Sequence, residues 1–543
     1  MNALPEQLQA LRYPRAYPHA VRAVDLLETH ISWVLLTGRF AYKIKRPVHY
    51  PFIDLRRSAQ RRRLCYEEVR LNRRFAPELY LGVSTVRLRH GEAHIGGSGR
   101  IIEYAVRMRQ FPRAQELGTL LDERRIEPVE LEHFGRELAR LHARLPAARA
   151  RQRWGHPKAQ IESMRRNARE AVRAAQTLGK PAAAAVRAVQ ARLERWMGTA
   201  RPLLEQRFAA RRVRECHGDL HAGNIVRHGA GLTPFDCLEF DPALRWIDAA
   251  DEVAFLLMDL EARERPLHAQ AFLGGYLSAS GDYQSCLLLP LFRAHRALVR
   301  AKVMALNAAA SGTTGLAARK ARRDHERYVE CAHQALALQR PKLVLMSGLS
   351  GSGKTWLAQR LAPALRAVHL RSDIERKRLA GLPALARSGS ALGKGLYARG
   401  ATRAVYDRLA QCAADALAGG CTTIVDATFG QSADRARFRA LAAGLGIDTW
   451  VVYCHAARET LEARIHERHE RANDPSEADI RVLDWQEAHF TPPAPREGIT
   501  VLDAARLAPR KIVSRISGRI RAGTPRLLPI HRKPPPAHDA TTT

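Results

Sequence analysis

Residues 343–355 read LVLMSGLSGSGKT, an apolar run that ends in a glycine-rich turn, and the chain continues as WLAQRLAPAL. The run is typical of a buried strand and its continuation of a helix. The glycines let backbone N–H groups turn toward phosphate oxygens, and the helix N-terminus adds a positive dipole. In this pattern the lysine reaches the β- and γ-phosphates and the next hydroxyl holds Mg²⁺. The predicted phosphate site comprises Gly348, Ser350, Gly351, Ser352, Gly353, Lys354 and Thr355.

Strand-like and helix-like segments alternate from Leu343 onward. The strand candidates are LVLMS, AVHLRS, TTIVDATF, TWVVYC and ITVLDA. Regular alternation of this kind predicts an α/β domain with a mostly parallel sheet. We assign this domain to residues 341–508.

Charged residues near the predicted strand ends suggest what the site does with its nucleotide. Asp426 ends an apolar strand, where a carboxylate can approach Mg²⁺ or its water. Asp373 follows another strand, where it could accept the proton of an attacking hydroxyl. Arg464 and Arg468 share a predicted helix and could close over the transferring phosphoryl group as a lid, although a plain surface position is the alternative.

These features resemble the P-loop (AAA-type) kinases of small molecules and nucleic-acid ends, the gluconate kinase, polynucleotide kinase and zeta-toxin-like group. The resemblance covers about residues 341–503. It implies that the Asp after the second strand orients the acceptor hydroxyl, and Asp373 stands there in the context SDIERKR.

A second constellation lies upstream, where residues 217–226 read HGDLHAGNIV and residues 234–240 read PFDCLEF. Asp219 is followed five positions later by Asn224, and Asp236 comes after a short predicted hairpin. This spacing matches the catalytic loop and metal-binding segment of protein kinases. Asp219 would take or orient the proton of the acceptor hydroxyl, while Asn224 and Asp236 would hold Mg²⁺.

The HGDLHAGN segment resembles the aminoglycoside phosphotransferase and choline-kinase-like branch of the kinase superfamily, over about residues 30–310. The resemblance implies a small sheet lobe, a hinge and a helical lobe. It also implies a phosphate-binding Lys on the third strand, which is Lys43 or Lys45, and a Glu on the next helix. Of Glu67 and Glu68 we favour Glu68. The two lysines share one face of the strand, so the sequence does not separate them.

Two departures from that family pattern stand out. The opening hairpin, TGRF, has no G-x-G-x-x-G, and the D-F-G position reads Asp236-Cys-Leu-Glu239-Phe-Asp241. Glu239 or Asp241 either adds a metal contact or is structural.

Local sequence patterns, independently of that resemblance, predict an antiparallel sheet in the N-terminal region. WVLLTG and FAYKIK form a predicted hairpin joined at Thr37-Gly38, a helix is expected over about residues 56–75, and strands over 83–88 and 101–108 follow. Apolar residues then step by three and four from Leu131, which predicts an amphipathic helix. The expected fold is an α+β protein-kinase-like bilobal domain, with a small antiparallel sheet lobe and a helical lobe, followed by the α/β P-loop domain.

The order of the two domains resembles a group of bacterial fusion proteins described as kinases or ATP-binding proteins. We expect residues 1–310 to form the aminoglycoside phosphotransferase-like domain and residues 311–340 a helical linker. Residues 509–543, which are basic and rich in proline, are expected to be a disordered tail.

The charge of the chain is unusual, with 88 Lys plus Arg against 54 Asp plus Glu and a net charge of +34 over 543 residues. Such a charge is compatible with a nucleic-acid partner but does not require one, because a general arginine bias explains it as well. Eight spread-out cysteines without a C-x-x-C pair, and no long apolar run, predict a cytoplasmic protein without membrane insertion.

Together these features predict a bifunctional kinase that uses ATP and Mg²⁺ at two nucleotide sites. It would transfer the γ-phosphoryl group to a hydroxyl of a small molecule. The alternatives are a regulatory protein in which one domain senses ATP, and a nucleic-acid end kinase. The sequence identifies neither the acceptor nor the oligomeric state.

Overall fold

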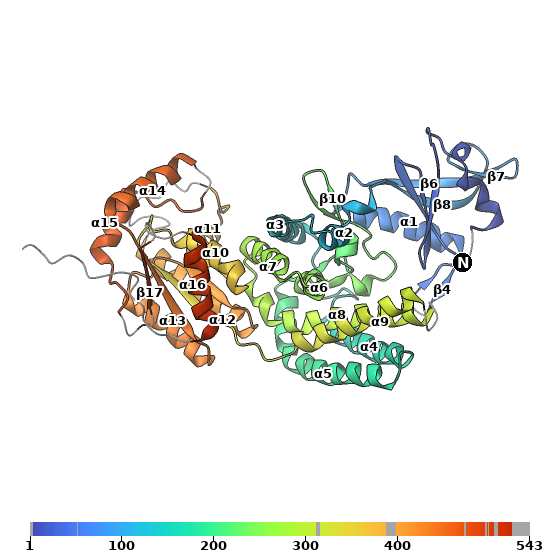
Figure 1. The fold of residues 1–543 in the computed structure, drawn as a ribbon. Helices are drawn as coiled ribbons and strands as arrows, with labels where there is room; N and C mark the ends of the chain where they lie inside the picture. The colour runs from blue at the N-terminus through green and yellow to red at the C-terminus, as the bar shows by residue number, and fades with distance from the viewer. Residues whose placement is uncertain are drawn as a thin grey trace, which may run out of the picture. The chain divides into compact units, whose positions relative to one another are not determined.

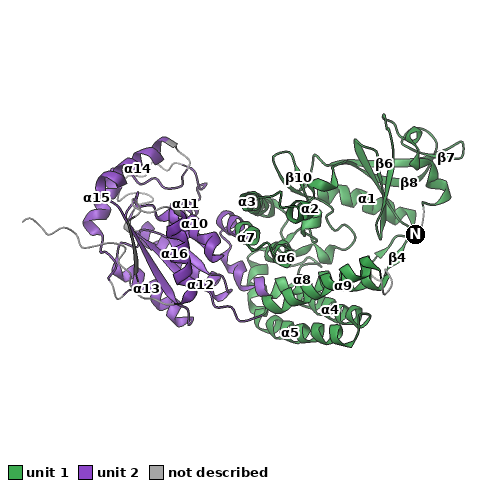
Figure 2. Cartoon of the chain, in the orientation of Figure 1, with its two compact units in different colours: residues 1–272, 291–336 green, residues 273–290, 337–543 purple. Residues whose placement is uncertain are grey.

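The computed structural model describes residues 4–50, 53–310, 315–386, 398–471, 474–494, 497, 499–503 and 509–523. The chain divides into two compact units (Figure 2). The first unit contains residues 1–272 and 291–336, and the second contains residues 273–290 and 337–543. Each unit is built around its own sheet.

The sheet of the first unit has six antiparallel strands in the order β1-β2-β3-β8-β6-β7. The predicted hairpin at Thr37-Gly38 is confirmed, with Gly38 at a φ of 88° in the turn. Helix α1 packs on the sheet through Cys65 and Val69 (Figure 1). The bounds are β1 Asp25–Glu28, β2 Ser32–Leu36, β3 Phe40–Lys45, α1 Ser58–Asn72, β6 Tyr80–Arg89, β7 Glu92–Ile95 and β8 Arg100–Arg109.

Helices and short hairpins form the rest of this unit. The predicted amphipathic helix is α3, which buries Leu131, Phe134 and Leu138. Strands β9 and β12 pair, as do β10 and β11, and the loop that carries Asp219 joins β9 to β10. The remaining bounds are β4 His49–Tyr50, β5 Ile53–Asp54, α2 Leu117–Asp122, α3 Pro128–Arg144, α4 Pro157–Gln176, α5 Lys180–Ala209, β9 Val213–Glu215, β10 Ile225–His228, β11 Gly231–Pro234, β12 Trp246–Asp248, α6 Ala249–Ala262 and α9 Leu316–Ala335. Helices α7 Pro266–Ser280 and α8 Leu289–Ala310 each have part of their residues in the second unit.

The sheet of the second unit has five strands in the order β14-β15-β13-β16-β17, and every pair is parallel. The predicted parallel sheet is confirmed. Its strands are β13 Leu343–Ser347, β14 Val368–Arg371, β15 Thr423–Asp426, β16 Thr449–His455 and β17 Ile499–Asp503. Its helices are α10 Lys354–Leu365, α11 Ser372–Leu379, α12 Arg399–Ala418, α13 Ser432–Gly444, α14 Arg458–Arg471, α15 Ile480–His489 and α16 Pro509–Ala522.

The boundaries of the two units differ from the predicted domain limits. Helix α9 lies in the expected linker but packs within the first unit, where Tyr328 donates a 2.8 Å hydrogen bond to Asp259. Residues 273–290 belong to the second unit, because Arg378 donates to the backbone carbonyls of Ser278 and Ala279 at the end of α7. The limits of the two units therefore depend on contacts between distant residues and do not follow simply from the order of segments along the chain.

The prediction of a disordered tail from residue 509 is wrong for its first part. Residues 509–522 form helix α16, which lies beside α10 (Figure 1). Ile512, Ile516 and Ile520 repeat every four residues and are buried against the sheet core. The basic residues between them hid this apolar stripe. Residues 524–543 lie outside the described part of the chain. Within the described residues, no helix is both long and apolar enough to span a bilayer.

Candidate active sites

The glycine-rich loop of the second unit follows β13, at the carboxyl edge of the parallel sheet. β15 lies on one side of β13 and β16 on the other, so the strand order reverses here, which is where ligands bind in open α/β sheets. The loop approaches neighbouring backbone closely. A Cβ at Gly348 would lie 2.2 Å from the carbonyl oxygen of Cys454, and one at Gly351 would lie 2.6 Å from that of Leu461. Only glycine fits at these two positions.

Polar groups in the loop are arranged to receive an anion. Lys354 Nζ donates a 2.6 Å hydrogen bond to the carbonyl of Leu349, and burial lowers the pKa of Lys354. Among the described residues, the buried Ser352 Oγ has no hydrogen-bond partner. Gln486 on α15 accepts a 2.8 Å hydrogen bond from the backbone N–H of Ser350. The Lys354 ammonium group and the unpaired Ser352 hydroxyl are suited to bind the phosphates of a nucleotide.

One cavity of about 690 Å³ adjoins this loop. Most of the site residues predicted for this unit line it, namely Ser350, Gly351, Gly353, Lys354, Thr355, Asp373, Asp426, Arg464 and Arg468. Gly348 and Ser352, which belong to the same loop, do not line the cavity. The cavity is also lined by the aromatic residues Trp356, Trp485 and Phe490 and by Gln486, which were not predicted from the sequence. An aromatic residue two positions after the loop lysine was the available signal for Trp356.

The charged residues of this cavity have defined partners. Burial raises the pKa of Asp426, but a 3.1 Å hydrogen bond from His369 outweighs it and lowers the pKa to about 2. Asp426 is therefore a carboxylate at neutral pH. Asp373 stands in the first turn of α11. Arg464 donates to the carbonyl of Gly351 at 3.3 Å, and Arg468 donates to that of Ala478 at 2.6 Å.

In the first unit, the predicted catalytic loop brings Asp219 and Asn224 together. Asn224 Nδ2 donates 2.9 Å hydrogen bonds to the backbone carbonyl and to Oδ2 of Asp219. Burial raises the pKa of Asp219, but the nearby His221 and Arg300 overcome this effect and hold it well below its usual range. Arg300, on α8, was not among the predicted residues, because its distance in the sequence gave no signal.

The two lysines of β3 occupy different places. Lys43 Nζ contacts Asp236 and lies 2.9 Å from Glu68 Oε1, and its side chain is 11% exposed. Lys45 is fully buried between Glu68 and Glu239. Burial lowers the pKa of both lysines, but the facing carboxylates outweigh it and raise both above the usual value. Glu68 thus bridges both lysines, and Glu239 faces Lys45.

The neighbouring acids take other partners. Glu67, the alternative to Glu68, lies 2.7 Å from Arg70 and 2.8 Å from Arg245. Asp241 caps a short helical turn by accepting the N–H of Ala243. Among the described residues, neither Glu67 nor Asp241 forms an ion pair with the lysines of β3.

Asp236 has a strained backbone, with a φ of 63° that is uncommon outside glycine. Its N–H donates a 3.0 Å hydrogen bond to the hydroxyl oxygen of Tyr80. The N–H of the next residue, Cys237, donates to the side-chain oxygen of Asn72 at 2.9 Å. Such strain persists where surrounding contacts over-determine it, often at functional sites.

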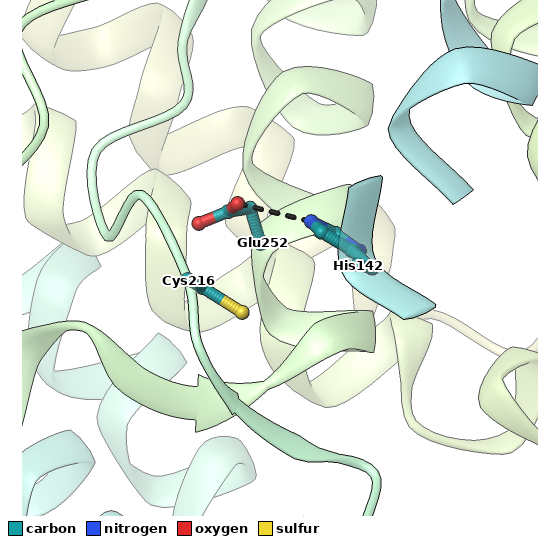
Figure 3. A group of neighbouring side chains, drawn as sticks. All are labelled: His142, Cys216 and Glu252. Carbon is teal, nitrogen blue, oxygen red and sulfur yellow. Dashed lines mark hydrogen bonds and ion pairs between the residues drawn. The ribbon is translucent and has the colours of Figure 1, made fainter. Parts of the chain in front are cut away.

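His142, Cys216 and Glu252 form a buried group whose ligand-type atoms lie within 4.8 Å of one another (Figure 3). Glu252 Oε1 accepts from His142 and from the N–H of His217, each at 3.1 Å, and Oε2 accepts from the N–H of Gly218 at 2.8 Å. Both oxygens are therefore used. Through these contacts, Glu252 holds the backbone of the loop that carries Asp219.

Two stretches of the chain match known protein families. Residues 48–289 match the Phosphotransferase enzyme family, and residues 343–493 match the AAA domain family. The fold and these matches define a kinase in which a phosphotransferase-family domain precedes an AAA-family domain that carries the phosphate loop.

The chain belongs to the family of a mycobacterial protein, Rv2004c of Mycobacterium tuberculosis H37Rv, which carries the description "uncharacterized protein". The two are 31% identical over 484 residues, which is 87% of this chain and 93% of the relative. The same figures hold for Mb2027c of Mycobacterium bovis. Similar solved structures include a gluconokinase from Sinorhizobium meliloti, at 18% identity and a TM-score of 0.24 over 34% of this chain and 99% of that one. The APS kinase CysC of Mycobacterium tuberculosis, in complex with AMPPNP and APS, has 22% identity and a TM-score of 0.26 over 34% and 99%.

Proposed function

We propose that the protein is an ATP- and Mg²⁺-dependent phosphotransferase with two nucleotide sites, which transfers the γ-phosphoryl group of ATP to a hydroxyl of a small molecule. One observation carries the proposal. A single cavity of the second unit is lined both by the phosphate-loop residues Lys354 and Thr355 and by the carboxylates Asp373 and Asp426. A transferase needs a group for the acceptor proton beside its phosphate site, whereas a nucleotide-sensing site does not.

In the second unit, the loop N–H groups and Lys354 would hold the phosphates. Thr355 and the ionised Asp426 would hold Mg²⁺, which when bound supplies charge neutralisation at the phosphates. Asp373 would orient the acceptor hydroxyl and take up its proton. Arg464, already beside the loop, would face the charge that moves from the γ- to the β-phosphate.

In the first unit, we propose a bilobal kinase arrangement, with the six-stranded sheet and α1 as the small lobe. Lys43 rather than Lys45 would reach the phosphates, because it contacts the partly exposed Asp236 while Lys45 is fully buried. Asn224 uses its amide nitrogen on Asp219, which leaves its oxygen for Mg²⁺ together with Asp236. Asp219 would take the proton of the acceptor hydroxyl.

Asp219→Asn and Asp373→Asn, made separately in the full chain, test this proposal. Each substitution keeps the size of the side chain but removes its ability to take a proton, so each should abolish one of two phosphoryl-transfer activities. The assay is transfer of label from γ-labelled ATP into a metabolite pool, with Lys354→Ala identifying the products of the second unit. Unchanged labelling in both Asn variants would contradict the proposal.

The label-transfer assay, together with equilibrium titration of nucleotide, separates the alternative functions. If nucleotide binds at both sites but transfer occurs at only one, the other unit is regulatory. Label in an oligonucleotide, with affinity that falls steeply as salt rises, would indicate a nucleic-acid end kinase. We place the protein in the reducing cytoplasm, because its eight cysteines are spread along the sequence without a C-x-x-C pair.

A further inference from the structure

The second histidine of the HGDLHAGN segment, His221, faces Asp219 but has no role in the functions assigned so far. Its Nε2 lies 3.5 Å from Asp219 Oδ2, and its Nδ1 lies 3.0 Å from the backbone nitrogen of Gly223. The ring meets Phe255 edge to face, with centroids 5.7 Å apart. Both ring nitrogens are thus directed at specific atoms.

These contacts define the tautomer of His221. A backbone N–H only donates, so Nδ1 must accept the hydrogen bond from Gly223. In a neutral imidazole the proton then lies on Nε2, and the Nε2–H faces Asp219. The hydrogen-bond network, rather than an observed hydrogen, assigns this arrangement.

The two carboxylate oxygens of Asp219 differ as a result. Oδ2 faces two donors, Asn224 Nδ2 at 2.9 Å and His221 Nε2 at 3.5 Å. Oδ1 has no hydrogen-bond donor among the described residues, and the side chain is 29% exposed. The loop therefore fixes Oδ2 of Asp219 and leaves Oδ1 available to accept a hydrogen bond from an acceptor hydroxyl.

We propose that His221 is a positioning residue, which together with Asn224 fixes Oδ2 of Asp219 and directs Oδ1 toward the acceptor hydroxyl. This inference rests on the proposed function of the first unit. In the transfer step, the acceptor oxygen forms a bond to the γ-phosphorus while the bond to the leaving diphosphate breaks and its electron pair leaves with the diphosphate. The hydroxyl proton passes to Oδ1 of Asp219 and is then released to water.

His221 does not take that proton itself. Its Nε2 already carries a proton, and its Nδ1 lone pair is used by Gly223. The backbone beside it is also fixed, because Asp259 Oδ2 accepts the N–H of Ala222 at 2.9 Å. The charged and titratable groups around Asp219 include His217, His221, Arg296, Arg300 and Asp236.

Two matched substitutions test the role of His221. His221→Gln keeps an N–H donor that can reach Asp219, whereas the shorter His221→Asn keeps an acceptor for Gly223 and holds its own N–H donor back from Asp219. Both are made in the full-length Lys354→Ala protein, where the second unit is silenced, and Mg²⁺-dependent ATP hydrolysis is measured with water as acceptor. The Gln variant should stay within about threefold of the parent kcat, and the Asn variant should lose about 10- to 100-fold with an unchanged KM for ATP. Equal losses in the two variants, or none in either, would overturn the positioning role.

Asp219→Asn in the same background separates this inference from the proposed function. Unchanged hydrolysis in Asp219→Asn would reject the catalytic assignment of the first unit as a whole. Loss in Asp219→Asn with identical Gln and Asn variants would reject only the role of His221.

A measurement that needs no turnover covers the case in which water is a poor acceptor. Nitrogen-15 spectra of histidine-labelled protein should show a neutral ring protonated at Nε2, assigned to His221 by its absence in His221→Gln. This signal should shift in Asp219→Asn. A ring protonated at Nδ1 would overturn the inference.

Discussion

At the scale of single residues, the two lysines of β3 show that chemically identical side chains can differ in burial and in their ionic partners. Both lie on one face of the strand, two residues apart. Lys43 contacts the partly exposed Asp236, whereas Lys45 has no exposed surface and lies between Glu68 and Glu239. A buried ion pair adds little to stability compared with apolar packing, but a buried charge that loses its partner is strongly unfavourable.

Lys45→Met should therefore destabilise the first unit by about 3–5 kcal/mol, because it leaves Glu239 buried without its cation. The measurement is the free energy of unfolding of that unit in denaturant. The double variant Lys45→Met/Glu239→Gln is the matched control and should recover part of the loss, since no unpaired charge remains on Glu239. A double variant as unstable as the single one would show that Glu239 is not the partner that matters.

At the scale of elements, helix α16 illustrates a stripe that composition conceals. Its sequence, PRKIVSRISGRIRA, is basic overall, yet Ile512, Ile516 and Ile520 fall on one face and are buried with α10. The helix closes part of the core of the second unit. The high overall charge of the tail does not reveal this pattern, because a helix can bury an apolar face while its opposite face is charged.

Ile516→Ala should destabilise the second unit by about 2–5 kcal/mol through lost apolar contacts and the cavity left behind. Arg515→Ala, on the exposed face of the same helix, is the matched control and should change the stability by less than about 0.5 kcal/mol. The unfolding midpoint of the second unit checks both. If the two variants were equally stable, α16 would not be part of the folded core.

At the scale of the whole molecule, the two units each have a core and a candidate nucleotide site of their own. Scanning calorimetry should therefore resolve a transition for each unit. A non-hydrolysable ATP analogue with Mg²⁺, at about 100 times its dissociation constant, should stabilise each unit by about 2.7 kcal/mol, since it binds only the folded state.

The Lys354→Ala variant should lose this stabilisation in the second unit and keep it in the first. Ligand-free Lys354→Ala protein serves as the control for effects of the substitution alone. Nucleotide stabilisation of only one unit in the wild-type protein would mean that the other unit binds no nucleotide.

Much of the fold could be predicted from local patterns. The phosphate loop and the N-terminal hairpin depend on residues that are near one another in the chain, such as Gly348 to Thr355. The parallel sheet pairs distant strands, but the regular alternation of strand-like and helix-like segments predicted it. The expected limits of the units and the disordered tail were less accurate. Residues 273–290 and α16 find their partners more than 90 residues away, as Arg378 does at Ala279.

The sequence by itself determined the phosphate-loop residues, the acids and the β3 lysines of the two candidate sites, because short motifs need fixed residue types at fixed spacing. Only the tertiary structure decided how those groups pair. It placed Lys43 beside Asp236, buried Lys45 against Glu239 and turned His221 toward Asp219. The physical reason is that burial and charge pairing act between residues that the folded chain brings together, and the spacing of residues along the chain carries no record of them.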